Sequence, residues 1–151
     1  MKKRAAMFMV TAALASASAV ALAAQGATSK NPASHMPASA GQASAAMHTK
    51  WMDDAAELQE DLKDALKAKS GPKAATAAVK IAGLMAQTQA YWAAKKESDI
   101  VKLAQESQGF ARQVAAAARA GKLDDASAAA TRMDATCSAC HELHPEKRPA
   151  A

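Results

Sequence analysis

The stretch of sequence that decides the fold covers residues 46–69 and is AMHTKWMDDAAELQEDLKDALKAK. Apolar side chains recur in it at every third or fourth position, and charged side chains fill most of the positions between them. This period places the apolar side chains on one face of an α-helix and the charges on the opposite face. We therefore predict an amphipathic helix whose apolar face packs against further helices. The apolar positions are Trp51, Ala55, Leu58, Leu62 and Leu66.

Three further segments carry the same helical period, and none shows the alternation that is typical of a strand. The segment Ser70-Gly71-Pro72 separates the first helix from the second, because glycine favours a helix C-terminus and proline a first helical turn. A polar break at residues 95–98 precedes the third helix, and Gly121 separates the third from the fourth. Four helices joined by short breaks predict an all-α fold, an antiparallel up-down-up-down four-helix bundle.

The N-terminus has the pattern of an export signal. Met1-Lys2-Lys3-Arg4 is positively charged, and residues 5–22 contain no charge and are largely apolar. This arrangement, with small residues before Ala24, predicts a secretory signal peptide over residues 1–23. A membrane anchor is the alternative, but the run is mostly Ala, Ser and Thr, which contribute little to insertion in lipid. We expect the chain to be exported to the periplasm, without stable membrane insertion after cleavage.

The remaining chain divides into a linker and one domain. Residues 24–45 are rich in Ala, Ser and Pro and lack a sustained apolar period, so we predict a flexible linker before a domain over residues 46–148. Loss of residues 1–23 leaves 16 Lys and Arg against 14 Asp and Glu, a formal net charge of +2. With aromatics at only 3% of the chain and not interleaved with basic clusters, nucleic-acid binding is not expected. An Ala-rich core buries little area per side chain, which favours a large buried cofactor.

The chemistry lies in the segment Cys137-Ser138-Ala139-Cys140-His141. Two cysteines at this spacing lie about one turn apart on a helix, and His141 follows directly. Such a pair can add to the two vinyl groups of a porphyrin as thioethers, while the imidazole binds the iron. We predict one covalently attached haem c per chain, held by Cys137 and Cys140, with His141 as the proximal ligand.

Other chemistries compete for these residues. Zinc could use Cys137, Cys140, His141 and His144, although one short helix seldom surrounds a tetrahedral ion. A thioredoxin-like pair requires a βαβ setting with a cysteine at a helix start, and cysteines without a function are a further alternative. The sequence offers no nucleophile with a suitably spaced His and carboxylate, no phosphate-binding glycine loop and no paired buried carboxylates. We expect no enzymatic activity.

The export signal, the four helices and the Cys-x-x-Cys-His motif near the C-terminus resemble the class II cytochromes c, which comprise cytochrome c′ and the low-spin cytochrome c556 type. The resemblance covers residues 46–148 and is best at residues 117–124 and 135–142; the first two helices match in pattern only. His144 and Pro145 depart from it, because the family often has an aromatic and then a basic residue after the ligand helix's histidine.

The resemblance implies that the residue on the distal side of the iron comes from the first helix, about six turns before the second begins. Counting back from Pro72 leads to Trp51 and Met52, so Met52 is the leading candidate for a sixth ligand. Met47 and His48 lie closer to the apolar face and are the alternatives. For the two methionines, ordinary packing in the core or at its rim competes with ligation.

The function expected from these features is that of a periplasmic monohaem electron carrier that exchanges electrons with redox partner proteins. A five-coordinate cytochrome c′-like protein that binds NO or another small gas is the first alternative. A haem-free, exported metal-binding bundle is the second. The resemblance also implies a homodimer formed through the first two helices.

Overall fold

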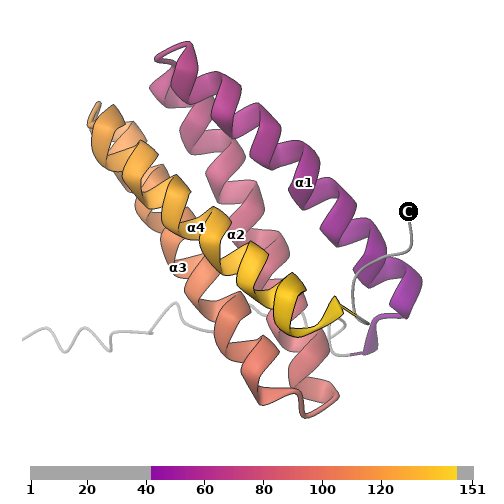
Figure 1. Ribbon diagram of the computed structural model, residues 1–151. Coiled ribbons are helices and arrows are strands. Elements are labelled where there is room, and N and C mark those ends of the chain that lie inside the picture. Colours follow the sequence, from indigo (N-terminus) through magenta and orange to yellow (C-terminus); the bar gives the residue numbers. More distant parts are fainter. Residues whose placement is uncertain (1–41, 146–151) are drawn as a thin grey trace, which may run out of the picture. The chain divides into compact units, whose positions relative to one another are not determined.

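The chain folds into four helices in the computed structural model, which describes residues 42–145 (Figure 1). They are α1 (Ala45–Lys67), α2 (Gly71–Ala94), α3 (Ser98–Arg119) and α4 (Leu123–Leu143), and residues 42–145 contain no strand. The predicted all-helical, four-helix bundle is thereby confirmed. The predicted signal peptide, the linker as far as Gly41 and the last three residues of the predicted domain lie outside the described residues. None of the four helices is long and apolar enough to cross a membrane.

The three turns between the helices share one form of closure. After α1, α2 and α3, one residue adopts a positive φ: Lys69 (54°), Lys96 (63°) and Gly121 (72°). The residue that follows each of them donates its backbone N–H to a carbonyl five residues earlier, at 2.8–3.2 Å. This closure satisfies carbonyls that the helix end would leave unpaired and reverses the chain within a few residues.

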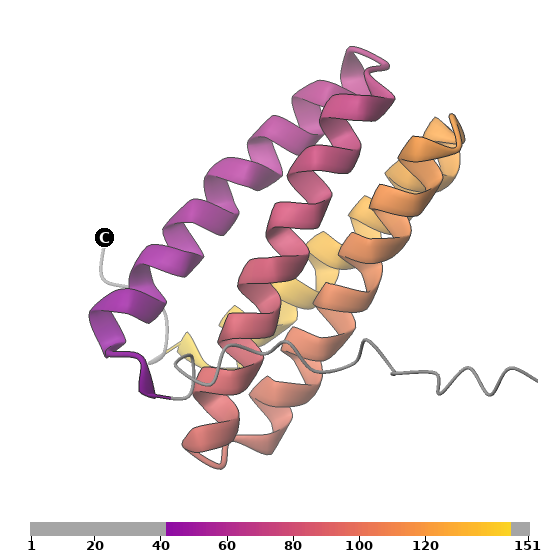
Figure 2. The ribbon, with the colours of Figure 1, turned by 180° about the vertical axis from the view of Figure 1, so that it is seen from behind.

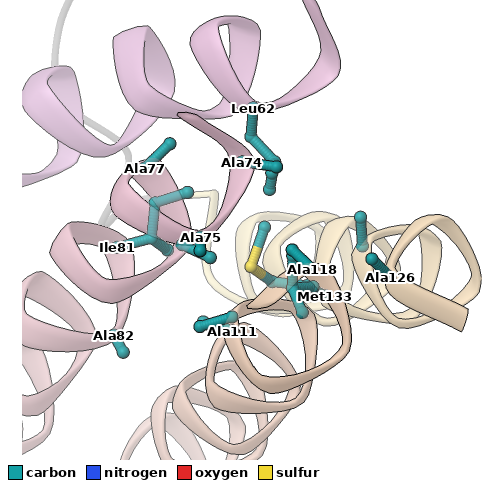
Figure 3. Packing of buried hydrophobic residues seen from close by; sticks show 14 of the residues in the cluster. Leu62, Ala74, Ala75, Ala77, Ile81, Ala82, Ala111, Ala118, Ala126 and Met133 are labelled. Carbon is teal, nitrogen blue, oxygen red and sulfur yellow. The ribbon is translucent and has the colours of Figure 1, made fainter. Parts of the chain in front are cut away.

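Small side chains let the helices approach closely and form most of the core. Its larger members, Leu62, Ile81 and Met133, are at most 1% exposed and lie among alanines from all four helices (Figure 3). At Gly71 an added Cβ would lie 2.7 Å from the backbone oxygen of Ala118, so the start of α2 touches the end of α3. A second, smaller cluster consists of three aromatic side chains and one isoleucine: Trp51, Tyr91, Trp92 and Ile100.

The helices do not pack equally on one another. α2 packs extensively against α3, as do α3 against α4 and α1 against α2, whereas α1 and α4 barely touch. Figures 1 and 2 show α1 (purple) standing apart from α4 (yellow) in both views. We call this boundary between α1 and α4 the seam.

Candidate functional site

A cavity of about 280 Å³ lies along the seam. Side chains from α1 and α4 face each other across it, and side chains from α2 and α3 complete its lining. This volume is slightly below the roughly 300–1,000 Å³ that ligand pockets usually occupy. Because α1 and α4 barely touch, the cavity could widen along the seam to admit a larger group.

The predicted attachment residues all line this cavity. Cys137, Cys140 and His141 are partly buried near the end of α4, and both cysteines are free thiols. Gln59 Nε2 donates a hydrogen bond to Cys137 Sγ at 3.3 Å, and Ser107 Oγ lies 3.5 Å from the same sulfur. Burial raises the pKa of both thiols, so they are protonated at neutral pH. The structure thus brings these three residues together in one pocket.

The three candidates for the distal ligand are placed differently. Met52 and His48 line the cavity from α1, whereas Met47 does not and its side chain is 53% exposed. The expectation that Met47 lies close to the apolar face is wrong, because the buried face of this turn passes through His48 and leaves Met47 on the exposed side. Met52, expected at the edge of that face, is partly buried and packs against both core clusters.

His48 is held firmly by aromatic neighbours. Its side chain is buried and stacks on Tyr91, with ring centroids 4.6 Å apart and an angle of 11° between the planes. Trp92 Nε1 donates a hydrogen bond to His48 Nε2 at 3.0 Å. Burial, followed by the positive charges of His141 and Lys95, lowers the pKa of His48 to about 4. The ring is therefore neutral at pH 7, and because Nε2 accepts, Nδ1 carries the proton.

Polar side chains inside the bundle gather at this cavity. Among the described residues the buried polar side chains are His48, Thr88 and Ser107, and all three line it. His48 is bonded to Trp92 and Ser107 contacts Cys137. Thr88 Oγ1 has no hydrogen-bond partner, and it is the single such buried side-chain atom in the described part of the chain. Buried polar groups are normally paired. Three of them line this cavity and one has no partner, which is typical of a binding site.

A hydrogen bond links the end of α4 to the start of α3. His144 Nε2 lies 2.8 Å from Asp99 Oδ2, and His144 also lines the cavity. The backbone N–H of Ile100 is the main cause of a lowered pKa for Asp99, with His144 a further cause. This contact restrains the end of the helix that carries Cys140 and His141.

Sequence reasoning missed several residues of the site. Gln59, Thr88, Ser107 and Trp92 are not among the site residues that the sequence predicts. Their polarity on otherwise apolar helix faces is the one signal that could have pointed to them. In residues 42–145 no group of three or more His, Cys, Asp or Glu side chains is arranged to hold a metal ion. Comparisons of the chain with protein-family models, with curated proteins and with solved structures find no match.

Proposed function

We propose that this chain is a monohaem c-type cytochrome that carries electrons, with the haem held in the seam between α1 and α4. The observation that supports this most is that Cys137, Cys140 and His141 line the same cavity as Met52. Two thiols one turn apart and an imidazole are the donor set for a covalently attached porphyrin with one axial nitrogen ligand. When bound, the haem supplies a one-electron couple between ferric and ferrous iron.

The residues of the cavity fit such a group. Its walls are mostly apolar, and the unpartnered hydroxyl of Thr88 offers a polar contact inside it. A porphyrin needs more room than about 280 Å³, so α1 and α4 would have to move apart. Because these two helices barely touch, that movement breaks little packing. The apolar walls would also exclude water and restrain the two sides of the iron.

The contacts between helices support an antiparallel, up-down-up-down topology. The start of α1 lies beside the end of α2, through His48 and Trp92, and Gln59 contacts Cys137 across the seam. In antiparallel helices, one turn toward the C-terminus of α4 from the contact between Gln59 and Cys137 leads to His141. The same step along α1 runs toward its N-terminus and leads to residues 55–56. Met52 follows within a further turn and also lines the cavity. It is thus on the α1 side of the cavity, facing the helix that carries His141.

We favour Met52 over the alternatives as the sixth ligand. Met47 is exposed and does not line the cavity. His48 does line it, but its Nε2 accepts the hydrogen bond of Trp92, and binding iron through that nitrogen would require this bond to break. A thioether and an imidazole as axial ligands give a low-spin, six-coordinate iron suited to electron transfer.

Expression of the full chain with a haem-attachment system tests the proposal. Mass spectrometry should show one haem-sized increment on the processed protein, and this increment should be lost in a Cys137→Ala, Cys140→Ala variant. Absorption spectra should be low-spin in the oxidised and reduced protein. Met52→Leu should convert the spectra to high-spin. Met47→Leu, at an exposed position five residues earlier in α1, should leave the spectra unchanged. A processed chain without haem would contradict the proposal and favour a haem-free bundle.

Spin state separates electron transfer from gas binding. A wild-type protein that is high-spin in both redox states, and whose spectrum changes on addition of NO or CO, would replace the electron carrier with the gas-binding alternative. Cys137, Cys140 and His141 would hold the haem in both cases. Export of the chain by residues 1–23 would deliver it to the periplasm, where fractionation and N-terminal sequencing of the mature protein test that part of the proposal.

A further inference from the structure

Thr88 differs from three of the four other threonines in the helices of this bundle, and it is the buried one of the five. Thr76, Thr131 and Thr136 each donate their hydroxyl to the carbonyl four residues earlier, at 2.9–3.2 Å. Thr88 is only 5% exposed, and its hydroxyl makes no such bond. A buried hydroxyl without a partner destabilises a fold, and the usual local remedy is this backbone bond. Because Thr88 is the buried threonine and lacks this backbone bond, we expect its hydroxyl to have a partner inside the cavity.

The position of Thr88 indicates which group that partner is. Thr88 precedes Trp92 by one turn of α2, and Met52 follows His48 by one turn of α1. Since Trp92 and His48 are joined by a hydrogen bond across the two helices, Thr88 and Met52 lie at a similar level of the cavity wall. Of the other buried polar groups that line the cavity, His48 Nε2 accepts from Trp92 and Ser107 contacts Cys137.

We propose that Thr88 is a positioning residue for the sixth ligand, donating its hydroxyl hydrogen to the sulfur of Met52 when that sulfur binds the iron. This inference rests on the proposed function. A thioether sulfur has two lone pairs, so one can bind iron while the other accepts a weak hydrogen bond. Met52 has a flexible side chain, and the bond would restrict it to the binding conformation. It would also withdraw electron density from the sulfur, which favours ferrous over ferric iron.

The test compares three variants of the haem-loaded, full-length protein. Thr88→Val keeps the shape of the side chain and removes the donor, whereas Thr88→Ser keeps the donor. Thr76→Val is the matched control, because it removes a hydroxyl from an exposed position of the same helix, bonded to the Pro72 carbonyl. The measurements are the reduction potential, by spectroelectrochemical titration, and the displacement of Met52 by added imidazole, followed in the absorption spectrum.

Thr88→Val should lower the reduction potential and tighten the apparent binding of imidazole to the reduced protein about three- to tenfold, as the loss of one hydrogen bond to a ligand implies. Thr88→Ser and Thr76→Val should both stay close to the wild type. Unchanged potential and imidazole binding in Thr88→Val would overturn the inference, as would a Thr88→Ser protein that behaves like the valine variant. Neither change is expected from a role in packing alone, since valine preserves the packing.

Three outcomes separate this inference from the proposed function. A low-spin spectrum that survives Met52→Leu would show that the sulfur of Met52 is not the ligand, which overturns the role of Thr88 and leaves the covalent haem in place. A wild-type chain without haem would overturn both. A high-spin Met52→Leu protein with an unaltered Thr88→Val protein would overturn the role of Thr88 alone.

Discussion

The pKa of His48 makes the stability of the haem-free chain depend on pH. In the folded chain it is about 4, against 6.5 for an unperturbed imidazole, because burial disfavours the charged ring. Between these two pH values the unfolded chain therefore binds the proton more readily than the folded chain. The free energy of unfolding is highest above pH 6.5, falls as the pH drops through this window, and stops falling below about pH 4.

The size of the effect follows from the same two values. The full difference between the two pKa values corresponds to about 3 kcal/mol in the free energy of unfolding. About 2 kcal/mol of this is lost between pH 7 and pH 5. Urea denaturation of the chain expressed without haem, at pH 7, 6 and 5, measures this loss. The matched variant is His48→Gln, whose amide oxygen can still accept from Trp92 Nε1 and which does not titrate.

Between pH 7 and pH 5 the free energy of unfolding of the wild type should fall by about 2 kcal/mol more than that of His48→Gln. The other described histidines, His141 and His144, are present in both proteins, so the comparison isolates the contribution of His48. Parallel dependence of the two proteins on pH would refute the reasoning, because it would mean that His48 is as easily protonated in the folded chain as in the unfolded one.

Four further predictions concern the bundle. Burial raises the pKa of Asp134, so its charge opposes folding at neutral pH; D134N should raise the urea midpoint at pH 7 and lose this advantage near pH 3, where both side chains are neutral. L62A should cost about 2–5 kcal/mol in denaturant unfolding, because Leu62 is 1% exposed in the core. G71A should destabilise by about 1–3 kcal/mol, since its Cβ would meet the Ala118 oxygen. G109A, where the added Cβ meets nothing, should instead stabilise by about 0.5–1 kcal/mol in thermal unfolding.

Helical periodicity was sufficient to predict the elements, because each helix is amphipathic over its own length. The first predicted helix, residues 46–69, differs from α1 by one residue at its start and two at its end. Gly121 closes α3 with a positive φ, as the sequence indicates. Lys69 and Lys96 adopt the same conformation at the other two turns, which lysine does not signal.

The arrangement of the site could be predicted only in part. A motif of five residues points to Cys137, Cys140 and His141 without any knowledge of the fold, because the chemistry depends on local spacing. Periodicity assigns a side chain to a face of its own helix and does not say which neighbouring helix covers that face. For this reason the open seam was not foreseen. The unpartnered state of Thr88 depends on contacts between helices, and no sequence pattern reports it.

The weak contact between α1 and α4 has a consequence for how the molecule opens. Without a group in the seam, α1 is attached mainly through α2, so it can separate as one unit while the other three helices stay packed. A group bound across the seam would join the first and last helices and make their opening cooperative. Amide hydrogen exchange should then slow along the whole of α1, including turns far from the cavity, while exchange in α3 changes little. Exchange measured by mass spectrometry on the haem-loaded and haem-free chains would show this difference.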